Sequence, residues 1–169
     1  MKLVVAVDKN WGIGYKGELL ARVRADLRYF QSLTKGNVVI LGSKTLATFP
    51  GGRVLKDRVN IVLSRREGYA PEGATVVNSI ESLNEEIKKY ESDSVFVIGG
   101  ATVYEQLLPY CDTAYVTKFG KEFESDAFFH NLDTCPDWYL YEAGEEQLTN
   151  PETDTEENMS FRFCVYKRK

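Results

Sequence analysis

The sequence predicts an α/β fold with a largely parallel sheet and an antiparallel edge formed by the C-terminal strands. β-Branched runs recur along the chain, helical patterns alternate with them up to about residue 120, and strands dominate after that point. The early runs VVAV, VVIL, NIVL and VFVI are apolar throughout, which is typical of strands covered by helices on both faces. The chain has 169 residues without a repeat or linker, so we expect one domain over residues 1–169.

Eight short runs rich in β-branched and aromatic residues are the expected strands, and the seventh is weaker than the others. They are Lys2–Val7, Asn37–Leu41, Arg58–Leu63, Thr75–Val77, Ser94–Ile98, Thr113–Phe119, Trp138–Tyr141 and Phe161–Lys167. Apolar residues at helical spacing predict a helix over Ile80–Tyr90, with Asn78 and Glu81 as a capping box. A further helix is expected around Val103–Leu108, and Pro109 ends it.

Composition argues against several classes of protein. The net charge of −4 and the isoelectric point near 5.2 argue against a nucleic-acid-binding surface. No apolar run approaches the ~18 residues of a membrane span, and MKLVVAVDKN lacks a signal-peptide pattern, so we expect a cytoplasmic protein. The cysteines Cys111, Cys135 and Cys164 are scattered and lack metal-binding spacing. The acidic stretch between Glu142 and Glu157 precedes a β-like run, which indicates a solvated hairpin loop.

The stretch ELLARVRADLRYF, residues 18–30, contains an acid at an unexpected place. Read as a helix, it puts Asp26 on one face with Leu27 and Phe30, although burying an unpaired charge is costly. Asp26 could serve the helix dipole or cap the helix, since Ala25 caps poorly. Alternatively, it faces an apolar cleft, where desolvation would raise its pKa and it would bind a cationic or amidine-like heterocycle.

Two glycine-containing segments resemble nucleotide motifs but depart from them. Gly12 to Gly17 read G-x-G-x-x-G, yet the helical pattern begins only around Arg24, so we interpret this segment as a flexible loop able to cover a site. Gly42-Ser43-Lys44-Thr45 resembles the end of a P-loop, but Asn37 stands where that motif needs its first glycine. The remaining strand, glycine and helix start still favour an anion, with a plain helix cap as the alternative.

Two other strand ends carry groups suited to phosphate. The strand ending at Gly99-Gly100 runs directly into a helix, which lets a ligand approach the backbone, although a sharp turn without a ligand would look the same. Together, the turns at Gly42 and at Gly99-Gly100 suggest a ligand with two or more phosphates. Ser64, Arg65 and Arg66 follow another apolar strand, where adjacent arginines suit a phosphate monoester or lie in solvent. The only histidine, His130, is a bystander, and no Ser/His/Asp arrangement indicates hydrolysis.

Placed in order, these segments resemble the dihydrofolate reductase family from Leu3 to Arg168. The order and spacing of the motifs carry the resemblance, and no single motif is decisive. The motifs are Ala6-Val7-Asp8, Gly12-Ile13-Gly14, Asp26-Leu27-x-x-Phe30, Gly42-Ser43-Lys44-Thr45, Asn60-Ile61-Val62-Leu63-Ser64-Arg65, Val97-Ile98-Gly99-Gly100-x-x-Val103-Tyr104, Thr117 and Asp126-Ala127-Phe128-Phe129. The resemblance implies an eight-stranded mixed, mostly parallel sheet with four helices, and a cis Gly99–Gly100 bond. It also implies an NADPH-dependent reduction of 7,8-dihydrofolate to 5,6,7,8-tetrahydrofolate for one-carbon metabolism.

The resemblance further implies a role for each matching residue. Asp26 would hold the pterin's N3 and 2-amino group with Thr117 as its partner, and Arg58 would pair with the glutamate α-carboxylate. Ser64, Arg65 and Arg66 would bind the 2′-phosphate and so favour NADPH over NADH. Other substrate-binding residues would be Val4, Val5, Ala6, Leu27, Phe30, Phe49, Leu55 and Ile98. Other cofactor-binding residues would be Ala6, Ile13, Gly14, Gly42, Ser43, Lys44, Thr45, Leu63, Ile98, Gly99, Gly100, Ala101, Thr102, Val103 and Tyr104. A monomer without a metal, inhibited by antifolates such as methotrexate or trimethoprim, is expected.

The chain departs from the family pattern near the acid. The family commonly has Leu-Pro-Trp and a second proline before it, where this chain has Leu19-Leu20-Ala21 and Arg24. Two alternative functions stay open. A pyrimidine reductase of riboflavin synthesis would share the fold but would not require Asp26 followed by Phe30, nor Arg58. A non-catalytic binder of folate or NADP is suggested by the altered loop.

Overall fold

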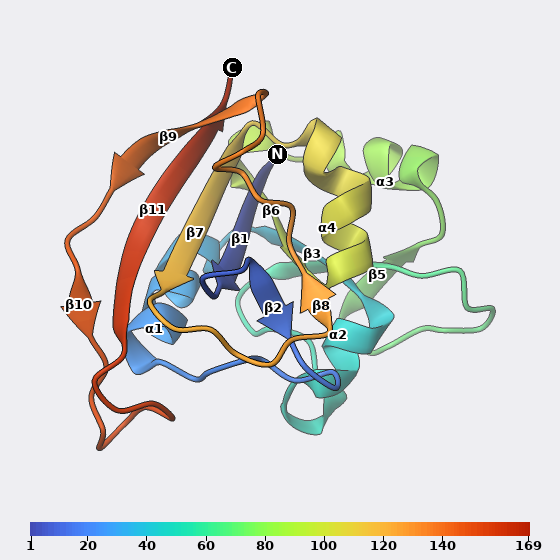
Figure 1. The fold of residues 1–169 in the computed structure, drawn as a ribbon. Coiled ribbons are helices and arrows are strands. Elements are labelled where there is room, and N and C mark those ends of the chain that lie inside the picture. The colour runs from blue at the N-terminus through green and yellow to red at the C-terminus, as the bar shows by residue number, and fades with distance from the viewer.

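A computed structural model describes residues 1–169, and its strands and helices follow the expected order (Figure 1). The strands are β1 (Lys2–Val7), β2 (Gly12–Gly14), β3 (Val38–Gly42), β4 (Val59–Leu63), β5 (Ala74–Val77), β6 (Val95–Gly99), β7 (Thr113–Phe119), β8 (Ala127–Phe128), β9 (Trp138–Ala143), β10 (Gln147–Leu148) and β11 (Ser160–Arg168). The helices are α1 (Arg24–Thr34), α2 (Ser43–Thr48), α3 (Ile80–Ile87) and α4 (Ala101–Leu107). All eight expected strands are present, whereas the short strands β2, β8 and β10 were not predicted. None of the helices is long and apolar enough to cross a membrane.

The large sheet has the order β10-β11-β7-β1-β6-β3-β4-β5, and β9 also pairs with β11. β9 and β10 pair with opposite ends of β11, on the side that does not face β7, so the sheet is eight positions wide. The pairs from β7 through β5 are parallel, and β11 adds an antiparallel edge. The predicted mixed, mostly parallel sheet with four helices is therefore confirmed. Because the inner strands are parallel, their carboxyl ends meet at one edge.

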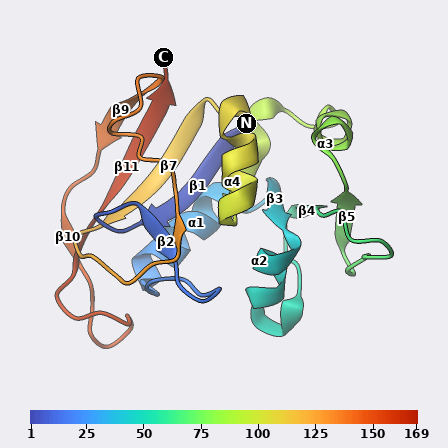
Figure 2. The same cartoon turned by 45° about the vertical axis from the view of Figure 1, so that its right-hand side comes forward.

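Apolar side chains pack against both faces of the sheet. One face carries the largest cluster, which includes Leu3, Ile40 and Leu107 and lies under α3 and α4. The opposite face carries two smaller clusters, one beside α1 around Val23 and one beside α2 around Leu46. Figures 1 and 2 show α4 and α1 on opposite sides of the central strands. Because the apolar side chains of this second face form two separate clusters, the region between them can carry side chains that bind a ligand.

Three local predictions need correction. The helix α3 is capped by Ser79, whose Oγ accepts the Ser82 N–H at 3.0 Å, and not by a box of Asn78 and Glu81. Asp26 is not a cap either, because α1 begins at Arg24 and Val23 occupies the cap position. Residues 12–14 form a strand paired with β8 instead of a free loop, because backbone pairing with a distant segment overrides local glycine content.

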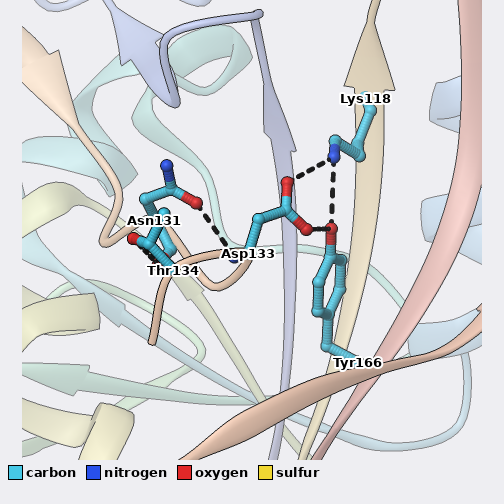
Figure 3. A network of polar contacts seen from close by, with 5 residues as sticks. All are labelled: Lys118, Asn131, Asp133, Thr134 and Tyr166. Atoms are coloured by element: carbon cyan, nitrogen blue, oxygen red, sulfur yellow. Dashed lines mark hydrogen bonds and ion pairs between the residues drawn. The ribbon is translucent and has the colours of Figure 1, made fainter. Parts of the chain in front are cut away.

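A polar network ties the segment after β8 to the sheet (Figure 3). The Lys118 ammonium lies 2.8 Å from Asp133 Oδ2 and donates to the Tyr166 hydroxyl at 3.2 Å. That hydroxyl in turn donates to Asp133 Oδ1 at 2.6 Å. Burial alone would raise the pKa of Asp133, but the Lys118 and Tyr166 hydrogen bonds lower it below its ordinary value. The network thus joins β7, β11 and the chain beyond β8, which pairs with β2.

Candidate active site

A pocket of about 840 Å³ opens at the carboxyl edge of the parallel strands. Its wall combines the ends of β3, β4 and β6, the starts of α2 and α4, and the β2 segment. The predicted cofactor residues that line it are Ala6, Ile13, Gly14, Gly42, Ser43, Lys44, Thr45, Leu63, Ser64, Arg65, Ile98, Gly99, Gly100, Ala101, Thr102, Val103 and Tyr104. Its volume falls within the range of roughly 300–1,000 Å³ typical of small-molecule sites.

Glycines keep the two strand-to-helix turns of this pocket open. A Cβ on Gly100 would lie 3.0 Å from Thr45 Oγ1, and one on Gly42 would lie 3.1 Å from Val103 Cγ2. Any larger residue would push these turns apart or fill the space between them. The Gly99–Gly100 bond is cis, as the family resemblance implied. The bare backbone at both turns leaves room for a group such as a pyrophosphate.

A second recess continues from the pocket at the end of β4. Ser64 and Arg65 line both the pocket and the recess, whereas Arg66 lines only the recess. The Arg66 guanidinium lies 4.9 Å from the centre of the Tyr69 ring, which holds it in place. The recess includes one acid, Glu67, against two arginines. Hydroxyl and guanidinium donors side by side fit a terminal phosphate monoester, so the pocket and recess together fit an adenine dinucleotide phosphate.

Asp26 lies one strand away from the pocket, in the first turn of α1. The Thr117 hydroxyl on β7 donates a 2.6 Å hydrogen bond to Asp26 Oδ1, and no lysine or arginine forms an ion pair with this carboxylate. Thr117 is paired in register with Ala6 of β1, which lines the pocket. Burial raises the pKa of Asp26, and the Thr117 hydrogen bond offsets part of this rise. The site therefore holds a desolvated acid without a cationic partner.

Tyr104 joins the acid to the pocket. Its hydroxyl donates to the Val4 carbonyl at 2.6 Å, and its side chain lines the pocket. Burial raises the pKa of Tyr104, and the nearby negative charge of Asp26 raises it further. Tyr104 thus connects the pocket to β1, whose neighbour β7 carries the Thr117 that holds Asp26.

The other predicted substrate residues lie outside the pocket lining, except Val5, Ala6 and Ile98. On α1, Leu27 is exposed, and the Arg58 guanidinium lies 5.9 Å from the centre of the Phe30 ring. Beside α2, Phe49, Leu55 and Ile98 pack on the same apolar cluster. These two groups of side chains lie on the sheet face that also carries Asp26 and Thr117.

Several pocket residues were not predicted. They are Gly17, Glu18, Leu19, Thr48, Asn78, Ser79, Ile80, Gln106, Asp126 and Ala127. Asn78 follows β5, so the rule that ligands bind at carboxyl ends of parallel strands could have found it. Asp126 belongs to a motif that carries the family resemblance, but nothing in its local sequence marks it as a pocket residue. It reaches the pocket because its N–H donates to the Gly14 carbonyl at 3.0 Å, and its carboxylate accepts the Lys16 N–H at 3.0 Å.

Comparison with known proteins gives consistent results. The family profile described as dihydrofolate reductase matches residues 1–168. The dihydrofolate reductase of Staphylococcus haemolyticus is 35% identical over 172 residues, which cover 99% of this chain and 95% of that protein. The Rattus norvegicus dihydrofolate reductase is 35% identical over 187 residues, which cover 100% of this chain and 97% of that protein. A solved structure of dihydrofolate reductase from Enterococcus faecalis superposes with a TM-score of 0.85 at 30% identity. The superposition covers 99% of this chain and 95% of the enterococcal chain, which is complexed with NADP(H) and RAB-propyl.

Proposed function

The chain belongs to the dihydrofolate reductase family and is an NADPH-dependent dihydrofolate reductase, and we propose which of its residues carry the reaction. One observation carries the assignment of the substrate side. It is the Thr117–Asp26 hydrogen bond of 2.6 Å on a desolvated acid that no cation neutralises. Such an acid binds an amidine-like edge through two parallel hydrogen bonds, and this edge is what a pterin presents. A pyrimidine reductase would not require that acid.

Asp26 and Thr117 act together at the pterin. Asp26 grips N3 and the 2-amino group, which fixes the ring and polarises it toward protonation at N5. Thr117 holds the carboxylate through its hydroxyl, so the acid is aligned before the substrate arrives. The proton reaches N5 from water admitted beneath the β2 segment. Residues Val4, Val5, Ala6, Leu27, Phe30, Phe49, Leu55 and Ile98 wall the pterin and p-aminobenzoyl rings and exclude other water.

Arg58 is proposed to bind the glutamate α-carboxylate. Its Nε donates to Thr34 Oγ1 at 3.1 Å and its Nη1 to the Lys56 carbonyl at 3.0 Å. A guanidinium has five N–H donors, so three remain for a carboxylate. The two internal hydrogen bonds hold the guanidinium beside Phe30, where a two-pronged contact becomes available.

The pocket and recess are proposed to hold NADPH, which supplies the hydride for C6 of the substrate. Ala6, Ile13, Gly14 and Tyr104 would flank the nicotinamide, and Ser64, Arg65 and Arg66 would bind the 2′-phosphate. The pyrophosphate and the linking riboses would contact Gly42, Ser43, Lys44, Thr45, Leu63, Ile98, Gly99, Gly100, Ala101, Thr102 and Val103. Chain groups thereby align the two reactants and keep the reacting atoms dry, and this alignment is the protein's share of catalysis.

We also propose that the chain works as one domain, as a monomer and in the cytoplasm. The largest apolar cluster includes both Met1 and Tyr166, so both ends of the chain contribute to one core. The three cysteines are free, which suits a reducing compartment. Because the enterococcal relative is complexed with RAB-propyl as well as NADP(H), we propose that antifolates such as methotrexate or trimethoprim occupy the Asp26 side.

The test is the loss of NADPH absorbance when the protein is mixed with NADPH and dihydrofolate. Asp26→Asn should lower turnover at neutral pH by about 100-fold, because the neutral amide no longer polarises the pterin. NADPH affinity should stay nearly unchanged, since Asp26 does not line the pocket. Asp137 is exposed, so Asp137→Asn is the matched control and should keep full activity. Wild-type protein that binds methotrexate tightly without consuming NADPH would instead indicate a non-catalytic binder, and an equal loss of NADPH binding in Asp26→Asn would contradict the assigned role.

A further inference from the structure

The helix that carries Asp26 begins without a cap of its own. Its cap position is Val23, whose aliphatic side chain cannot accept a hydrogen bond. The first helical residue is Arg24, where the family pattern commonly has a proline. Proline suits that position because it has no N–H to satisfy. Arg24 therefore adds a backbone donor to the first turn, and this donor has no partner within the helix.

The partner comes from the loop between β10 and β11. The Arg24 N–H donates to Asp154 Oδ1 at 2.8 Å, across 130 residues of sequence. The neighbouring Thr155 secures Arg22 from both sides, because its Oγ1 accepts the Arg22 N–H at 2.9 Å and its own N–H donates to the Arg22 carbonyl at 3.1 Å. In both views of the fold this loop lies next to the start of α1 (Figures 1 and 2). Three hydrogen bonds thus hold the two residues that flank Val23.

The loop, residues 149–159, is itself held in shape. At its base the Thr149 N–H donates to the Met159 carbonyl at 2.9 Å, and the Met159 N–H donates to Thr149 Oγ1 at 3.0 Å. Met159 is buried in the same apolar cluster as Val23. Within the loop, Asp154 Oδ2 accepts the Asn150 N–H at 2.7 Å. An ordered loop can therefore serve as a fixed support for α1.

The carboxylate of Asp154 also matches the electrostatics of its position. A negative charge at a helix N-terminus is stabilised by the partial positive charge there. Partial burial alone would raise the pKa of Asp154, but the hydrogen bonds from Arg24 and Asn150 lower it below its ordinary value. The acid therefore stays ionised at neutral pH while it caps the helix.

We propose that Asp154 is a positioning residue for the reaction: it caps the Arg24 N–H from the 149–159 loop and so fixes the first turn of α1, which holds Asp26 against Thr117. This inference rests on the proposed role of Asp26 in binding the pterin. Asp26 is two residues beyond Arg24, so a frayed first turn moves its carboxylate away from the Thr117 hydroxyl. The acidic loop thus satisfies the Arg24 N–H, whereas a proline at this position would have no N–H to satisfy.

The first experiment compares Asp154→Ala with Glu157→Ala, an exposed acid in the same loop. Loss of a helix cap lowers the equilibrium constant for forming the turn by roughly fivefold, so Asp154→Ala should lower kcat/KM for dihydrofolate by a factor of up to about five. The loss should include a higher KM for dihydrofolate, while NADPH still binds at one molecule per chain. Glu157→Ala should leave both values unchanged. A lower kcat with unchanged KM and less NADPH bound at saturation would indicate partial unfolding and contradict positioning.

The second experiment removes the donor in place of the acceptor. Val23 already has φ −119° and ψ 118°, the extended conformation that a residue before proline prefers. Arg24→Pro alone should lower kcat/KM, because the proline ring occupies the place where Asp154 receives the N–H. In the Asp154→Ala background the same proline removes the unsatisfied donor, so the double variant should recover most of the wild-type kcat/KM. A double variant no better than Asp154→Ala alone would overturn the proposal.

Hydrogen exchange of the Arg24 amide separates this inference from the proposed function. The amide should exchange several times faster in Asp154→Ala than in the wild type, whatever reaction the protein catalyses. Asp154→Asn, which can still accept the hydrogen bond, should restore slow exchange and serves as the conservative variant. Unchanged exchange in Asp154→Ala would refute the cap, whereas absence of dihydrofolate reduction by the wild type would refute only the proposed function.

Discussion

At the scale of single residues, the site depends on how the Asp26 carboxylate is held in place without a lysine or arginine partner. Its one side-chain partner is the Thr117 hydroxyl, and burial raises the pKa of the carboxyl. A permanent salt bridge would lower that pKa and occupy the oxygens that are proposed to bind the pterin. A neutral hydroxyl occupies one lone pair of Oδ1, so Oδ2 and the second lone pair of Oδ1 can still accept the two hydrogen bonds of the proposed substrate contact.

Thr117→Val should raise the pKa of Asp26 further. The hydrogen bond from Thr117 favours the ionised form, so its removal leaves burial as the main influence. Titration of the Asp26 carboxyl carbon by NMR in both proteins measures the change. Because a carboxyl with a raised pKa costs stability when it ionises, the variant should also lose stability as the pH rises through the new pKa. A downward shift would contradict the described hydrogen bond.

At the scale of elements, pairing between distant segments shapes the region around the pocket. The strand β2 is held by β8, and the chain after β8 is fastened to β7 and β11 by the network in Figure 3. Asp133 contributes the only carboxylate of that network, and Lys118 and Tyr166 lower its pKa. The network therefore supports β2 from a distance.

Asp133→Asn should lower the free energy of unfolding at neutral pH and leave turnover largely unchanged. The pKa of Asp133 is lower in the folded protein than its ordinary value of 3.8, so the ionised form stabilises the fold. This contribution is complete above the ordinary pKa and disappears as the pH falls through the folded value. Urea unfolding of both proteins between pH 7 and pH 3 measures it. A stability difference that persists or grows at acidic pH would contradict this account.

At the scale of the whole molecule, the parallel sheet gathers the cofactor groups at one edge. The ends of β3, β4 and β6 contribute Ser43, Ser64 and Gly100 to one pocket, although they are far apart in sequence. A ligand that contacts all three ends stabilises the folded chain as a unit, since the unfolded chain cannot bind it. The same edge thus couples cofactor binding to global stability.

NADPH at about 100 times its Kd should raise the Tm by roughly 5 to 10 °C, as expected for a stabilisation of about 2.7 kcal/mol in a chain of this size. NADH at the same concentration should give a clearly smaller shift, because it lacks the 2′-phosphate that Ser64, Arg65 and Arg66 are proposed to bind. Differential scanning calorimetry measures both shifts. Equal shifts for the two cofactors would show that the second recess does not bind the 2′-phosphate.

The local composition of the chain was enough to predict the sheet and the strand ends that meet at the pocket, whereas the other pocket residues were predicted from the family resemblance. Uniformly apolar runs identify buried parallel strands, and the residue after each such strand must lie at the carboxyl edge, so Gly42, Ser64 and Gly99 could be placed without coordinates. Asp26 was also found in this way, because an acid on an apolar helix face conflicts with its neighbours. These features depend on periodicity and on residue type, both of which are written in the sequence.

Only the tertiary structure decided what holds the start of α1 and the β2 segment. Asp154 caps a helix 130 residues away, Thr117 reaches Asp26 across 91 residues, and Asp126 supports Gly14 from another loop. Short polar residues look alike in sequence, because each can bond to its own neighbours or to any segment that folding brings near. Their partners are set by the packing of the sheet and helices, and that packing is a property of the whole chain.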